Sequence, residues 1–155
     1  MTIYFLRHAD AESMASSDFE RNLTPKGLEQ AAKVGRYCKA HGLAPDKILT
    51  SPLNRARQTA EIVAKALGAE PVVQDWLACG MRLETLLKEL SAQGKVESLL
   101  VVGHEPDFSS VISELIGASE GYGVLVTKAS LTAVELPWME AGSGQLQFSI
   151  PVRLM

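Results

Sequence analysis

Residues 2–12 read TIYFLRHADAE, and this stretch sets the interpretation of the whole chain. An apolar run from Ile3 to Leu6 ends abruptly in Arg7 and His8. Four consecutive apolar residues of this kind are typical of a strand covered on both faces of a sheet. A cation and a titratable imidazole at the tip of a buried strand indicate that the strand presents reactive groups at its end.

Strands of this type alternate with helical patterns along the rest of the chain. Thr24 is a candidate cap for a helix with Pro25 at its first position, which His41-Gly42 would end. We expect strands at 2–7, 47–51, 70–74, 98–103, 129–136 and 146–151, and further helices from Pro52 to Gly68, at 82–90 and at 108–117. This order predicts an α/β fold with three layers: a mostly parallel sheet flanked by helices, with an antiparallel C-terminal hairpin.

The composition restricts the class of protein. A chain of 155 residues with 46% hydrophobic and 21% charged residues predicts a single folded domain over 1–155. The net charge of -3 and the lack of a basic stripe argue against a nucleic-acid partner. No apolar run reaches membrane-spanning length, and Arg7 interrupts the N-terminal one too early for a signal peptide. Cys38 and Cys79 form no CxxC pair, so we expect a cytoplasmic protein with reduced thiols and no membrane partner.

Three of the predicted strands end in residues that bear chemistry. The first ends in Arg7-His8, the second in Ser51-Pro52 with Arg55 one turn later, and the fourth in Gly103-His104. The carboxyl ends of parallel strands meet at one edge of a sheet, where ligands of open α/β folds bind. We therefore expect two histidines and two arginines to converge on one crevice.

Such a cluster suits phosphoryl chemistry. Guanidinium groups bind phosphate through two parallel hydrogen bonds, and a neutral imidazole is a competent nucleophile. A second imidazole can stabilise the charge on the transferred oxygens. No Walker-type glycine loop is present. A metal site built from His8, Asp10 and Glu12 is disfavoured, because Arg7 would repel a cation there.

The three motifs together carry a family resemblance. LRHADAE, then SPLNRARQTAE, then VVGHEPDFS occur in the order typical of the histidine phosphatase (phosphoglycerate-mutase-like) superfamily. The short chain and the wording RHADAE and GHEPD are most similar to its SixA-type branch, the phosphohistidine phosphatases. The matching segments run from the first strand to residue 110.

The resemblance implies a role for each matching residue. His8 would be phosphorylated during turnover, and Arg7, Arg55 and His104 would bind the phosphoryl group. Arg21 falls where SixA-type proteins also carry an arginine and would be a further phosphate ligand. The resemblance implies neither a metal nor another cofactor.

The favoured substrate is a phosphohistidine-bearing protein such as a phosphotransfer domain. The alternatives are a small phosphomonoester, or a non-catalytic module that binds phosphoproteins, against which an intact His8 argues. Mutase activity is disfavoured, since the chain is too short for substrate-enclosing insertions. The sequence carries no signal for an oligomeric state.

The chain departs from the family pattern in two places. Ala9 stands where the family commonly has glycine, which is tolerable if its φ is negative. Many members also carry a glutamate, in the loop after the third strand, that protonates the leaving group. Here that loop reads QDWLACGMRLE (74–84), and the expected position falls near Ala78-Cys79-Gly80. Other candidate acids are Asp18, Asp75 and Glu84, although Asp18 is expected to be a solvated loop carboxylate.

Several residues near these motifs have simpler structural interpretations. Glu105 and Asp107 precede a predicted helix and would cap it, although Glu105 could also orient His104. Trp76 and Trp138 are expected to be packing residues, with Trp76 also a candidate for the mouth of the site.

Overall fold

The computed structural model describes residues 1–118 and 123–155. Its strands are β1 (Thr2–Arg7), β2 (Lys47–Thr50), β3 (Pro71–Val73), β4 (Ser98–Gly103), β5 (Leu131–Glu135) and β6 (Gln145–Ile150). Its helices are α1 (Pro25–Ala40), α2 (Asn54–Leu67), α3 (Leu83–Ser91) and α4 (Asp107–Leu115). Short 3₁₀ turns span Asp75–Leu77 and Val152–Leu154.

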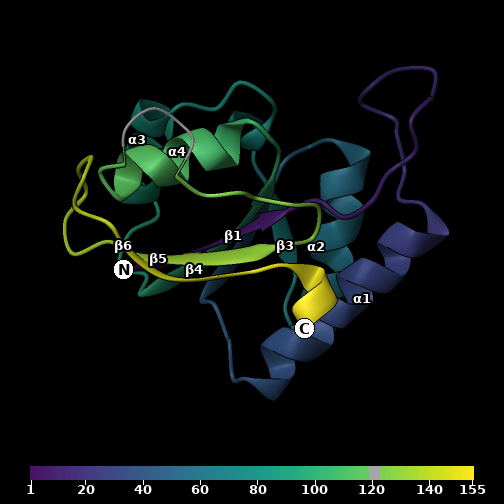
Figure 1. The fold of residues 1–155 in the computed structure, drawn as a ribbon, viewed down its shortest axis with the longest axis horizontal. Coiled ribbons are helices and arrows are strands. Elements are labelled where there is room, and N and C mark those ends of the chain that lie inside the picture. Colours follow the sequence, from purple (N-terminus) through teal and green to yellow (C-terminus); the bar gives the residue numbers. More distant parts are fainter. Residues whose placement is uncertain (119–122) are drawn as a thin grey trace.

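The six strands form one sheet in the order β3-β2-β4-β1-β5-β6 (Figure 1). The first four strands of this order are parallel, whereas β5 pairs antiparallel with β1 and β6 antiparallel with β5. The prediction of a mostly parallel sheet with an antiparallel C-terminal hairpin is confirmed.

Two hydrophobic cores lie on the two faces of the sheet, as the predicted three layers require. Alternate residues of β1 and β4 pack on one face with α3 and α4, among them Phe5, Val101 and Phe108. The intervening residues, such as Leu6 and Val102, pack on the other face with α1 and α2. Figure 1 shows α3 and α4 on one side of the sheet and α1 and α2 on the other. Because β1 and β4 are covered on both faces, their sequences are continuous apolar runs.

The helix boundaries follow from local chemistry. Thr24 caps α1, its hydroxyl accepting from Gly27 N at 3.1 Å, and Pro25 opens the helix as expected. The helix predicted from Pro52 begins two residues later, at Asn54. Ser51 Oγ accepts a hydrogen bond from Leu53 N at 3.3 Å, which ties the intervening residues into a turn. Gly68 ends α2 in the left-handed conformation.

The end of the chain differs from expectation in one respect. Trp138 was expected to be a packing residue, but its side chain is 67% exposed in the connection between β5 and β6.

Trp76 is half-buried against the α3–α4 core and donates to Gln74 Oε1 at 3.1 Å.

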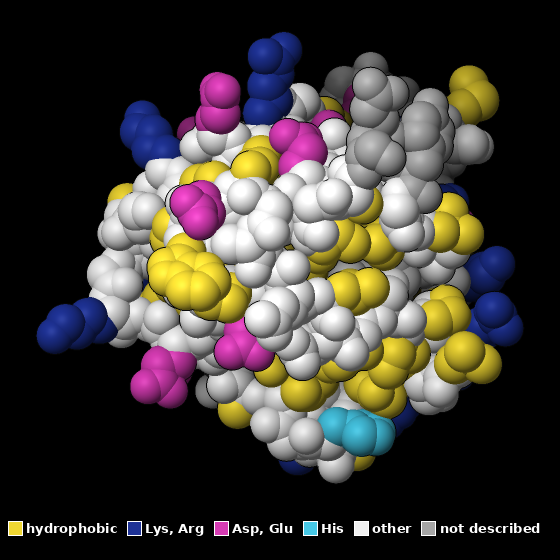
Figure 2. Space-filling view, turned by 60° about the vertical axis from the view of Figure 1, so that its left-hand side comes forward, with side chains coloured by type: hydrophobic (Ala, Val, Ile, Leu, Met, Phe, Trp, Pro, Cys, Tyr) yellow, Lys and Arg dark blue, Asp and Glu magenta, His cyan; other side chains and the backbone are white. Residues whose placement is uncertain are grey.

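The surface carries both signs of charge. On the face shown in Figure 2, carboxylates lie among the basic side chains on the left, and further lysine and arginine side chains lie close together along the right edge. Within the described ranges, no helix is both long and apolar enough to cross a membrane.

Candidate active site

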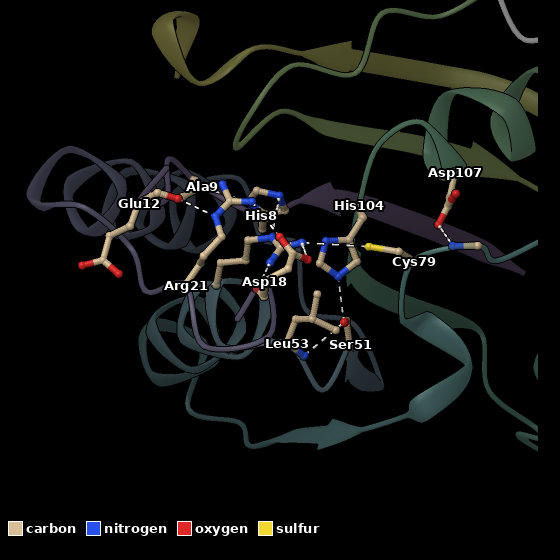
Figure 3. A network of polar contacts seen from close by, with 12 residues as sticks. His8, Ala9, Glu12, Asp18, Arg21, Ser51, Leu53, Cys79, His104 and Asp107 are labelled. Atoms are coloured by element: carbon tan, nitrogen blue, oxygen red, sulfur yellow. Dashed lines mark hydrogen bonds and ion pairs between the residues drawn. The ribbon is translucent and has the colours of Figure 1, made fainter. Parts of the chain in front are cut away.

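The register of the parallel strands brings three strand tips together. Arg7 of β1 pairs with Gly103 of β4, and Thr50 of β2 pairs with Val102. The residues that follow, His8, Ser51 and His104, therefore lie at one edge of the sheet. The rings of His8 and His104 are 5.3 Å apart between centroids, and Figure 3 shows them side by side. The sequence prediction of converging histidines is correct.

The backbone beside His8 determines which of its nitrogens is available. His8 Nδ1–H donates to the Ala9 carbonyl at 2.8 Å, so the proton of the neutral ring resides on Nδ1. Nε2 then carries a lone pair and accepts from Arg55 Nε at 3.3 Å. Ala9 is itself held by its N–H, which donates to Thr59 Oγ1 at 3.1 Å.

The backbone conformation at Ala9 answers the first departure from the family pattern. Within the described ranges, Ala129 is the one non-glycine residue with positive φ, at 55°. Ala9 thus has the negative φ that tolerates a methyl group in place of the family glycine.

Burial keeps both histidines neutral. Burial, together with the charges of Arg55 and Arg7, lowers the pKa of His8 to about 4, against the opposing effect of the Ala9 hydrogen bond. Burial also lowers the pKa of His104 to about 3, with contributions from His8 and Arg55. At neutral pH His8 Nε2 consequently carries no proton, as nucleophilic attack requires, and its lone pair accepts from Arg55 until that contact opens.

Arg55 projects from the first turn of α2 and is almost fully buried. All three of its nitrogens have partners. Besides the bond from Nε to His8, Nη1 donates to the Asp18 carbonyl at 2.8 Å, and Nη2 donates to Asp18 Oδ2 at 3.1 Å. Nη2 also lies 3.9 Å from Cys79 Sγ. The guanidinium thus joins His8 to two loops.

Asp18 is more than the solvated loop carboxylate that was expected. Its Oδ1 accepts from Arg21 Nη1 at 2.8 Å while Oδ2 binds Arg55, so one carboxylate bridges both arginines (Figure 3). The hydrogen bond from Arg21, together with Arg55, holds the pKa of Asp18 below its usual value. Arg21, whose Nε also donates to the Glu12 carbonyl, is therefore connected to His8 through Asp18 and Arg55.

Arg7 is the last residue of β1 and directly precedes His8. Its Nη1 donates to the Val126 carbonyl at 3.0 Å, and its buried Nε has no partner among the described residues. Its charge is close enough to lower the pKa of both histidines. Arg7, His8, Arg55 and His104 thus form a compact group, hereafter the His–Arg cluster.

The carboxylates after β1 have structural partners. Asp10 accepts from Lys128 Nζ and Thr24 Oγ1, each at 2.7 Å, and Glu12 Oε2 accepts from Asn22 N at 3.0 Å. Across the described part of the chain, no three His, Cys, Asp or Glu side chains are grouped so as to hold a metal ion.

The carboxylates after β4 also stabilise local structure. Glu105 accepts from Ser109 N and Oγ in the first turn of α4, which agrees with the predicted capping role. Asp107 was expected to cap α4, but its Oδ2 accepts from Gly80 N at 2.7 Å and Met81 N at 3.2 Å. It therefore fixes the loop after β3, which places Cys79 beside Arg55. Burial raises the pKa of the Cys79 thiol, so the thiol is protonated at neutral pH.

Sequence reasoning missed one partner within the site. Ser51 is fully buried, and its hydroxyl lies 2.7 Å from His104 Nε2. The signal was available, because Ser51 ends the second of the three strands whose tips were predicted to meet.

Comparison with known proteins agrees with this geometry. Residues 3–78 match the family model of the histidine phosphatase superfamily (branch 1). The chain is 34% identical to the phosphohistidine phosphatase SixA homolog of Haemophilus influenzae, over 76% of this chain and 78% of that protein. It is 28% identical to phosphohistidine phosphatase SixA of Escherichia coli, over 97% of this chain and 93% of that protein.

A solved structure is similar over nearly the whole length. The protein histidine phosphatase SixA complexed with tungstate superposes with a TM-score of 0.88, at 26% identity, covering 99% of this chain and 98% of the other. Motifs, sheet order and relatives all agree: the chain belongs to the histidine phosphatase superfamily, in its SixA branch, and is a phosphatase.

Proposed function

We propose that this phosphatase hydrolyses phosphohistidine on a phosphotransfer protein, by way of a phosphoryl group carried on His8. The observation that supports this most strongly is the state of His8. Its Nε2 is unprotonated and lies against Arg55 and near His104, both of which can bind phosphoryl oxygens. The names of the relatives, which include two phosphohistidine phosphatases, support the same substrate class.

The reaction proceeds in two displacements. The Nε2 lone pair of His8 attacks phosphorus in line, and the P–N bond to the substrate imidazole breaks. During this step His8 Nδ1–H stays bonded to the Ala9 carbonyl, which stabilises the positive charge that the ring gains. Water then attacks the phosphorus and the P–Nε2 bond breaks, which returns its electron pair to His8 and releases inorganic phosphate. The protons of the water pass to phosphate or solvent, and neutral His8 is regenerated. Arg7, Arg55 and His104 stabilise the charge on the transferred oxygens.

The groups around Arg55 favour a leaving group that needs no acid from the enzyme. The carboxylate in contact with Arg55 is Asp18, whose lowered pKa leaves it without a proton at neutral pH. The loop after β3 contributes the Cys79 thiol at this place. A substrate imidazole can take a proton from solvent on its second nitrogen before the P–N bond breaks. An alkoxide has no such route, and a positioned acid is worth roughly 100- to 10,000-fold for it.

The reaction as proposed uses no metal ion and no other cofactor. Two arginines beside the nucleophile supply the positive charge that a metal supplies in other phosphoryl-transfer sites. Arg21 acts on the substrate only after Asp18 releases it.

A substrate panel tests the proposal. We expect hydrolysis of a phosphohistidine-bearing phosphotransfer domain to be fastest, p-nitrophenyl phosphate intermediate, and phosphoserine and glycerol phosphate slowest. EDTA should leave these rates unchanged. Alkyl phosphates hydrolysed as fast as phosphohistidine would instead indicate a general phosphomonoesterase, and inactivation by EDTA that metal reverses would contradict the metal-free mechanism.

Trapping tests the intermediate. After brief exposure to substrate and an acid-free quench, mass spectrometry should find the phosphoryl group on His8. His8→Ala should abolish turnover, whereas His41→Ala, which alters an exposed histidine at the end of α1, should not. A fully active His8→Ala variant would exclude the mechanism. If the wild type shows no turnover, and the wild type and His8→Ala bind phosphoprotein equally well, the protein would instead be a binding module.

A further inference from the structure

The structure assigns Ser51 a positioning role that neither the sequence motifs nor the relatives suggested: its hydroxyl selects the tautomer of His104 that donates to the phosphoryl group. This inference deepens the proposed function and rests on it only for the identity of the acceptor. It depends on the hydrogen bonds of two side chains that are almost fully buried.

The hydrogen bonds of Ser51 determine the direction of its contact with His104. Its Oγ already accepts from Leu53 N at 3.3 Å. The remaining contact of the hydroxyl is His104 Nε2 at 2.7 Å. A buried hydroxyl proton requires an acceptor, and within the described ranges His104 Nε2 is the one in reach. Ser51 O–H therefore donates, and Nε2 accepts.

The proton of the neutral His104 ring must then reside on Nδ1. The low pKa of His104 excludes a second ring proton at neutral pH. Nδ1 is buried, and among the described residues it has no hydrogen-bond partner. In Figure 3 the ring turns one nitrogen to Ser51 and the other to the side on which His8 lies.

An unpartnered buried N–H beside the nucleophile is a donor that lacks its acceptor. A phosphoryl oxygen on its way to His8 would supply the acceptor. The other tautomer would present a lone pair to that oxygen and repel it. The arrangement is therefore complementary to the transferred phosphoryl group. Ser51 maintains it without adding a charge to the site, because its hydroxyl is neutral.

The tautomer is directly measurable in the free protein. Long-range ¹H–¹⁵N spectra should show His104 of the wild type with a protonated Nδ1 and a bare Nε2. In Ser51→Ala the signal should shift towards the tautomer with Nε2–H. Tungstate should bind about tenfold or more weakly, as for the loss of a hydrogen bond to a charged ligand. kcat for p-nitrophenyl phosphate should fall by about 10- to 100-fold.

Ser113→Ala is the matched control. Ser113 is also a fully buried serine, and its Oγ has no partner within the described part of the chain. This variant should keep the His104 spectrum, the tungstate affinity and kcat of the wild type.

The outcomes separate the two proposals. A wild-type His104 protonated at Nε2, or a Ser51→Ala variant with the spectrum of the wild type, would overturn the role of Ser51. A wild type with the expected spectrum that hydrolyses no phosphorylated substrate would overturn the proposed function instead.

Discussion

Burial, at the scale of single residues, decides what each side chain of the site can do. His8 and His104 would be partly protonated near pH 6.5 in water, but in the folded chain their pKa values fall to about 4 and 3. Asp18, by contrast, is largely exposed and charged at neutral pH, and the two arginines that bind it lower its pKa. One hydrogen-bond network thus joins the neutral His8, through Arg55, to the charged Asp18.

The fork of Arg55 leads to the first prediction. Its three nitrogens bind His8, the Asp18 carbonyl and the Asp18 carboxylate, a geometry that a lysine ammonium cannot reproduce. Arg55→Lys should lower kcat/KM for p-nitrophenyl phosphate by about 100- to 1,000-fold. Arg57→Lys is the control, because Arg57 lies on the same helix in a surface pair with Glu61. An equal fall of kcat/KM in both variants would show that α2 tolerates no arginine-to-lysine substitution. A fully active Arg55→Lys would contradict the role of the Arg55 guanidinium.

A second prediction concerns the Asp18 bridge. The carboxylate occupies both Arg55 and Arg21, so an incoming phosphoryl group competes with it. Asp18→Asn weakens this competitor, and we expect KM for p-nitrophenyl phosphate to fall several-fold while kcat stays within about threefold. Glu20→Gln, a neutral change in the same exposed loop, should alter neither constant. A large fall in kcat for Asp18→Asn would show instead that Asp18 takes part in proton transfer.

The elements of secondary structure are what carry these residues to one place. Parallel pairing brings the tips of β1, β2 and β4 to one edge, and the antiparallel β5 covers the open side of β1. The turn before β5 then holds the tip of β1, because Ala129 N donates to the carbonyls of Arg7 and His8, each at 3.2 Å. The position of His8 therefore depends on Ala129, some 120 residues away in the chain. It also depends on α1, which packs against the backbone of Asp10 just after His8.

Gly27 gives the third prediction, at the contact between α1 and the segment after β1. A Cβ at this position would lie 1.9 Å from the Asp10 carbonyl oxygen. Gly27→Ala should thus push α1 away from the backbone that carries His8. We expect the free energy of unfolding to fall by about 1–3 kcal/mol, as for overpacked cores, and kcat to fall with it. Glu29→Ala, an exposed change on the same helix, should be neutral in denaturant titration and in turnover. A Gly27→Ala variant as stable as the wild type would show that the contact yields easily.

For the whole molecule, keeping two neutral histidines inside the protein has a consequence for stability. The unfolded chain takes up a proton on each histidine near pH 6.5, whereas the native protein does so only near pH 4 and 3. Between these values the unfolded state binds more protons than the native state. The stability due to the neutral histidines is therefore fully present above pH 6.5 and is lost as the pH falls.

This gives the fourth prediction. From pH 7 to pH 5 the free energy of unfolding should decrease by about 1–2 kcal/mol for each of the two histidines. The carboxyl groups of Asp10 and Asp18, whose pKa values are lowered, change the stability with pH only below pH 5, outside the range that is compared. Urea titrations at the two pH values measure the difference, which His8→Gln should reduce by about half. A stability that does not change between pH 7 and 5 would contradict the assigned pKa shifts.

The sequence by itself determined the order of the elements and the chemistry at the strand tips. Apolar runs, the Thr24-Pro25 helix start and Gly68 are local signals, so all six strands and four helices lie where they were expected, to within a few residues. The RHADAE, SPLNRARQTAE and VVGHEPD motifs likewise identified the family and the residues of the His–Arg cluster.

Only the tertiary structure decided how those residues are connected. The bridge from Arg21 through Asp18 to Arg55, the loop held by Asp107 and the contact between Ser51 and His104 all join segments far apart in the chain. The exposed Trp138 likewise could not be inferred from its residue type. Hydrogen bonds, burial and protonation states are properties of neighbours in space, and the chain acquires those neighbours only when its sheet has formed.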